Sequence, residues 1–129
     1  MRIHHLGYLV KKIDKAIKAF EALGYSLTQQ TILDEYRQAN ICFLEKDGYV
    51  VELVSPVSKE SVVADLIKRL GNSPYHFCYV TDCIEDDISR LQEQHYVMCS
   101  ELHSAVALND KRVCFLIHPY LGMIELLEA

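Results

Sequence analysis

Hydrophobic and polar positions follow the same pattern twice along this chain of 129 residues. An apolar run of strand character at residues 3–10 contains His5, and a similar run from residue 75 contains His76. After each run, apolar positions recur at helical spacing, and further strand-like runs follow at nearly the same separation. Because self-similarity of this kind indicates one structural unit encoded twice, we expect two copies of the same module.

Each module predicts the element order β-α-β-β-β. The first helix is expected to start at Ile13 and to end at Gly24, and Asp47-Gly48 favours a tight hairpin before the last strand. Two modules of this size are marginal alone, so we expect a single domain over 1–129. The expected boundaries are module one at 1–56, a linker helix at 57–73 and module two at 74–129, with strands at 3–10, 25–33, 40–45, 49–54, 75–80, 95–102, 112–117 and 121–128.

Composition narrows the functional classes. Half of the residues are apolar, a quarter are charged, and the net charge is −5 without a basic cluster, which argues against a nucleic-acid partner. No apolar run has the roughly 20 residues that a membrane span needs, and no signal peptide is evident, so a cytoplasmic protein is expected. The five cysteines include no Cys-x-x-Cys pair, and we expect all of them to be reduced.

Four polar residues interrupt the apolar strands at matching positions of the two modules: His5 and His76, and Glu52 and Glu125. A lone strand histidine is more often a core residue than a ligand, but carboxylates are rarely buried unless they are paired or bind a metal. Symmetric packing of the modules would bring all four side chains together. Two imidazoles and two carboxylates form a ligand set for zinc, nickel, cobalt, iron or manganese.

The modules and the His…Glu…His…Glu set resemble the vicinal oxygen chelate superfamily over nearly the whole chain, through segments 3–10, 51–56, 74–80 and 122–128. The resemblance implies an α+β fold in which two tandem βαβββ modules form an eight-stranded, cup-shaped mixed β-barrel around one divalent metal ion. It also implies that His5, Glu52, His76 and Glu125 are the metal ligands, with nickel, cobalt or zinc as the expected ion. A homodimer is expected as well.

Two members of the superfamily are similar in different ways. Glyoxalase I enzymes use the same ligand quartet, but their bacterial type has a basic residue where this chain has Leu9. Methylmalonyl-CoA epimerases have a similar linker between modules and a segment like 115–119. Their catalytic glutamate lies upstream of the third strand, where Glu35 falls about one residue out of register, and a solvated loop carboxylate is an equally good interpretation of Glu35.

The expected function is therefore a glyoxalase I-like isomerisation of a hemithioacetal, with methylmalonyl-CoA epimerase as the alternative. In both, a metal-assisted proton transfer passes through an enediolate or enolate, with Glu125 as the base and Glu52 as its partner. Glu35 joins them as a catalytic residue only in the epimerase. An iron-dependent dioxygenase is disfavoured by the fourth ligand, Glu52. A metal-free protein that binds a small molecule such as an antibiotic is the non-enzymatic alternative.

Overall fold

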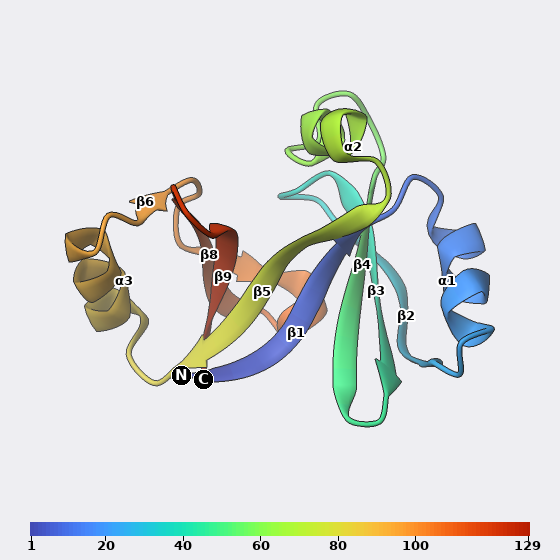
Figure 1. The fold of residues 1–129 in the computed structure, drawn as a ribbon, viewed down its shortest axis with the longest axis horizontal. Helices are drawn as coiled ribbons and strands as arrows, with labels where there is room; N and C mark the ends of the chain where they lie inside the picture. Colours follow the sequence, from blue (N-terminus) through green and yellow to red (C-terminus); the bar gives the residue numbers. More distant parts are fainter. The chain divides into compact units, whose positions relative to one another are not determined.

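The computed structural model describes all 129 residues, and the chain forms two compact units. One unit consists of residues 1–5 and 75–129, and the other of residues 6–74. Both combine helices with strands, which confirms the predicted α+β class (Figure 1). The elements are, in chain order, β1 (Arg2–Leu9), α1 (Ile13–Glu21), β2 (Ser26–Asp34), β3 (Ala39–Lys46), β4 (Tyr49–Pro56), α2 (Ala64–Leu70), β5 (Ser73–Thr81), α3 (Ile84–Glu93), β6 (Val97–Met98), β7 (His103–Ala105), the 3₁₀ turn η1 (Val106–Leu108), β8 (Lys111–His118) and β9 (Gly122–Glu128).

The strands of the two units follow the same order. In residues 6–74 the order is β1-β4-β3-β2, with β1 parallel to β4 and the other neighbours antiparallel. In the other unit it is β5-β9-β8-β6, with β5 parallel to β9 and the other neighbours antiparallel. A parallel pair needs a long crossover connection, and each unit has a helix in that connection, α1 or α3. The predicted repeat is thus present in the fold.

α1 and α3 each cover one face of the sheet in their own unit (Figure 1). The core beneath α1 includes Leu53 and Val51 of β4, and the core beneath α3 includes Ile124 and Leu126 of β9. Side chains alternate between the two faces of a strand. The residues between these core positions therefore point away from the helix, and these include one glutamate in each unit.

The structure has nine strands, whereas the sequence predicted eight, because the strand expected at 95–102 is reduced to Val97–Met98 and a further short strand, His103–Ala105, follows beyond its expected end. Only Val97–Met98 and His103–Ala105 pair with β8, as the short strands β6 and β7. Between them, the Ser100 hydroxyl accepts the amide hydrogen of Phe115 at 2.9 Å. A serine side chain competes in this way with the backbone ladder, and the regular pairing stops there.

None of the three α-helices has the length and the apolar character that crossing a bilayer would require.

Candidate metal centre

Three of the four residues singled out from the sequence meet in the unit of residues 1–5 and 75–129. His5 of β1, His76 of β5 and Glu125 of β9 are 1%, 3% and 0% exposed. Glu125 Oε1 lies 3.1 Å from His5 Nε2 and 3.3 Å from His76 Nε2. The two Nε2 atoms are 3.4 Å apart. Two imidazoles and a carboxylate thus converge on one buried point.

Strand register explains why these side chains converge. In the parallel pair β5–β9, Cys78 is the partner of Glu125 and His76 is the partner of Met123. His76 and Cys78 are two residues apart, so their side chains lie on the same face of β5. Glu125 lies between Ile124 and Leu126, which pack beneath α3, so its side chain is on the face away from the helix. A shift of one residue in either strand would separate His76 from Glu125.

The surrounding side chains hold both imidazoles in place. His4 Nδ1 lies 2.8 Å from His5 Nδ1, on the side of the ring away from Glu125. The ring of Phe115 contacts His76 edge-to-face, with centroids 5.3 Å apart. Metal-binding imidazoles commonly use their second nitrogen for a contact that fixes the ring, as His5 does with His4. The contact between His4 and His5 was not predicted, because strand alternation alone places their side chains on opposite faces.

The Glu125 carboxylate is held in its ionised form. Burial alone would raise the pKa of Glu125, but the contacts with His5 and His76 outweigh burial and hold the pKa well below its usual range. Glu125 Oε2 has no hydrogen-bond donor although it is buried. A buried carboxylate oxygen without a donor is costly, unless a cation or another group satisfies it.

The spacing of the three donor atoms fits a first-row divalent metal ion. Imidazole nitrogens and carboxylate oxygens bind zinc at about 2.0–2.2 Å, so two ligands at a tetrahedral angle are about 3.3–3.6 Å apart and two at a right angle about 3 Å apart. The observed separations are 3.1, 3.3 and 3.4 Å. Nitrogen and carboxylate donors together suit zinc, nickel, cobalt, iron or manganese. Both the donor types and their distances are therefore compatible with such an ion.

Glu52 lies in the other unit, where it has a cationic partner. It is fully buried on β4, and its Oε2 accepts a hydrogen bond from Arg37 Nη2 at 3.1 Å. Arg37, 2% exposed, also donates from Nε to Asp34 Oδ2 at 2.9 Å and from its backbone amide to Asp34 Oδ1. The Ser61 hydroxyl donates to the Arg37 carbonyl at 2.7 Å. Glu52 is thus part of a buried Asp34–Arg37–Glu52 ion-pair network.

The structure also distinguishes the two carboxylates at the end of β2. Asp34 is buried in the network with Arg37, whereas Glu35 is exposed in the turn that follows. The burial of Arg37 was not predicted from the sequence. Glu52 could have indicated it, because a buried carboxylate is usually paired with a cation. Arg37 is the nearest arginine before Glu52 in the same module.

Residues 4–115 match the family model of the Glyoxalase/Bleomycin resistance protein/Dioxygenase superfamily. The match covers most of the chain, and the protein belongs to this superfamily, as the sequence predicted. Over 116 residues the chain is 24% identical to the uncharacterized protein YqjC of Bacillus subtilis (strain 168), an alignment that spans 89% of this chain and 81% of that protein.

Solved structures of similar fold include methylmalonyl-CoA epimerases. The epimerase from Mycobacterium tuberculosis is 22% identical with a TM-score of 0.82, and the match covers 98% of this chain and 86% of that one. The Streptomyces coelicolor epimerase in complex with 2-nitronate-propionyl-CoA is 18% identical with a TM-score of 0.84, over 100% and 94% of the two chains. A hypothetical protein from Bacillus halodurans C-125 is 24% identical with a TM-score of 0.84, over 99% and 94%. At these identities the likeness concerns the fold.

Proposed function

We propose that this protein is a divalent-metal-dependent epimerase of an acyl-CoA thioester, which removes and returns the proton on the carbon next to the thioester carbonyl. The convergence of His5, His76 and Glu125 carries the proposal, because it supplies a metal ligand set and a carboxylate base at one buried point. Similar solved structures support the choice of substrate, since one is a methylmalonyl-CoA epimerase in complex with methylmalonyl-CoA and NH4+. On this balance the epimerase ranks above the glyoxalase I-like activity expected first from the sequence.

The two imidazole Nε2 atoms and the Glu125 carboxylate would hold the metal ion, which, when bound, supplies Lewis acidity for the charge that develops on the substrate oxygen. Glu125 is the proposed base, and its Oε2 is the available oxygen because no donor occupies it. In the first step the substrate C–H bond breaks, an O–H bond forms on Glu125, and the electron pair moves to the carbonyl oxygen. Return of a proton to the opposite face completes the inversion.

Inversion requires a second acid–base group, and Glu35 is the candidate that the resemblance to the epimerases supplies. Asp34 is the neighbouring alternative, but both of its oxygens accept hydrogen bonds from Arg37. The Asp34 carboxylate is therefore already engaged by the Arg37 side chain and backbone amide. Glu35 is exposed in the turn after β2, and its carboxylate takes part in no ion pair of this unit.

Proton NMR in D₂O tests the reaction on protein stripped of metal and reloaded with Ni²⁺ or Co²⁺. We expect deuterium at the α-carbon of one epimer of methylmalonyl-CoA, together with appearance of the other epimer. Glu125→Gln is expected to abolish both signals while the circular dichroism spectrum is unchanged, and full activity of this variant would refute the proposed base. Glu35→Gln is expected to retain exchange but to lose inversion, whereas Glu60→Gln, which alters another exposed carboxylate, is expected to retain both.

Metal stoichiometry provides a readout that does not depend on turnover. His76→Ala is expected to reduce bound metal from about one ion per chain to near zero, whereas His103→Ala, a histidine outside the proposed ligand set, is expected to bind as the unaltered protein does. Glu52→Gln tests the fourth predicted ligand separately, since Glu52 as a ligand rests on the sequence repeat. Stoichiometry near zero in the unaltered protein would favour the metal-free binding protein and refute the enzyme.

A glyoxalase I-like isomerase is the second candidate, supported by the carboxylate of Glu52, which is fully buried and corresponds in the repeat to Glu125. A parallel NMR sample with the hemithioacetal of methylglyoxal and glutathione distinguishes the two. Net conversion to deuterated lactoylglutathione, without exchange of methylmalonyl-CoA, would replace the epimerase with this activity.

A further inference from the structure

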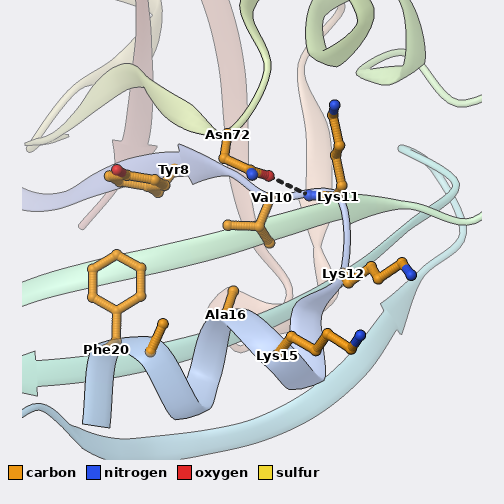
Figure 2. A pocket seen from close by; sticks show the side chains of 9 residues that line it. Tyr8, Val10, Lys11, Lys12, Lys15, Ala16, Phe20 and Asn72 are labelled. Carbon is orange, nitrogen blue, oxygen red and sulfur yellow. Dashed lines mark hydrogen bonds between the residues drawn. The ribbon is translucent and has the colours of Figure 1, made fainter. Parts of the chain in front are cut away.

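A pocket of about 450 Å³ lies between α1 and the outer face of β1 in the unit of residues 6–74 (Figure 2). This volume is within the range of small-molecule sites in proteins, about 300–1,000 Å³. The pocket is lined by Tyr8, Val10, Lys11, Lys12, Lys15, Ala16, Ala19, Phe20 and Asn72. No residue of the candidate metal centre or of the Asp34–Arg37–Glu52 network is among them.

One end of the pocket is cationic. Lys11, Lys12 and Lys15 are exposed, and none of their ammonium groups takes part in an ion pair. Asn72 closes this end, because its side-chain oxygen accepts a hydrogen bond from the Lys11 backbone amide at 2.8 Å. In Figure 2 the side chains of Lys12 and Lys15 point the same way, whereas that of Lys11 points to the other side. Lys12 and Lys15 therefore provide a local site for an anion in a protein of net charge −5.

The other end of the pocket is aromatic. The rings of Tyr8 and Phe20 meet edge-to-face, with centroids 5.2 Å apart and planes at 88°. Val10 and Ala16 lie between these rings and the lysines, as Figure 2 shows. The pocket therefore changes from apolar and aromatic to cationic along its length. A matching ligand has a flat apolar part at one end and a negative charge at the other.

Tyr8 of the pocket and His5 of the metal centre belong to the same strand, β1. His5 and Tyr8 are three residues apart in this strand, so their side chains point to opposite faces. The burial of β1 follows this alternation, with His5, Gly7 and Leu9 buried and the residues between them half-buried. A ligand in the pocket would therefore bind at a site separate from His5.

We propose that this pocket binds a nucleoside monophosphate. The ammonium groups of Lys12 and Lys15 match the two negative charges of a phosphate monoester better than the single charge of a carboxylate. A purine ring supplies the flat face that Tyr8 and Phe20 can contact. The proposal is independent of the proposed epimerase activity, because it uses neither the metal ligands nor the acid–base residues.

Isothermal titration of the intact protein with AMP tests the site, with adenosine and inorganic phosphate as partial ligands. We expect AMP to bind more tightly than either, because only AMP occupies both ends of the pocket. The double variant Lys12→Gln/Lys15→Gln is expected to bind AMP about tenfold more weakly, since it loses two phosphate contacts. Lys59→Gln/Lys68→Gln, which removes two exposed lysines elsewhere in the same unit, is expected to bind as the unaltered protein does.

Several results would overturn the proposal. These are no binding of AMP, equal weakening by the two double variants, or phosphate binding as tight as that of AMP. Competition between acyl-CoA and AMP in the unaltered protein, if it disappears in Lys12→Gln/Lys15→Gln, would also overturn the proposal. The two lysines would then belong to the substrate site. Circular dichroism on each variant establishes that the fold is retained, so that weaker binding is assigned to the lost charges.

Discussion

Replacing Arg37 with methionine tests whether the buried ion-pair network stabilises the unit of residues 6–74. Arg37 Nη2 is 3.1 Å from Glu52 Oε2, and Arg37 Nε is 2.9 Å from Asp34 Oδ2. All three residues are at most 2% exposed, so water does not replace the lost cation. Removing one partner of a buried ion pair costs about 3–5 kcal/mol. Domains are stable by about 5–15 kcal/mol, so we expect Arg37→Met to fold with much reduced stability.

Urea denaturation followed by circular dichroism measures this loss, since the chain contains no tryptophan for fluorescence. With a slope of about 1.5–2 kcal/mol per molar urea for a chain of this length, the midpoint is expected to fall by about 2 M. Arg112→Met is the matched control. Arg112 pairs with Glu85 and Glu128, but these residues are solvent-exposed or partly so, and we expect a much smaller change.

A double-mutant cycle identifies the cause of the loss. Combining Arg37→Met with Glu52→Gln removes one of the two carboxylates left without their cation, so part of the stability is expected to return. If Arg37→Met lowers the urea midpoint no more than Arg112→Met does, the buried network does not stabilise this unit. A double variant that is less stable than Arg37→Met alone would show that the uncompensated charge of Glu52 is not the cause of the loss.

Three further predictions concern thiols, core packing and a turn. Burial, followed by the charge of a nearby glutamate, raises the pKa of the Cys42 and Cys114 thiols to about 12, so iodoacetamide at pH 8 is expected to label the exposed Cys83 well before them; equal labelling rates by mass spectrometry would contradict this. Leu126→Ala removes a fully buried side chain and is expected to cost about 2–5 kcal/mol in urea denaturation; a loss below about 1 kcal/mol would show that the core beneath α3 collapses to fill the space. Gly48→Ala meets no atom within 4 Å but has to adopt a φ of +84°, so we expect a loss of about 1 kcal/mol, and an unchanged urea midpoint would contradict the strained turn.

Much of the fold was predictable because the relevant signals are local or periodic. Similar residues recur at a nearly constant separation along the sequence and predicted a repeated module. The two units have the same strand order, as such a repeat requires. Asp47-Gly48 predicted a tight turn, and both residues have positive φ. The shortening of the strand expected at 95–102 was not predictable, because it depends on a hydrogen bond between Ser100 and Phe115 of a distant strand.

The candidate site was also predictable only in part. The residue types at matching strand positions were predictable, because period-two alternation and the repeat are visible in the sequence. Which atoms meet depends on the folded chain: His5 and His76 with Glu125, His4 with His5, and Arg37 with Glu52. A buried charge is stabilised by partners that strand register and turn geometry bring close. Separation along the sequence does not encode those distances.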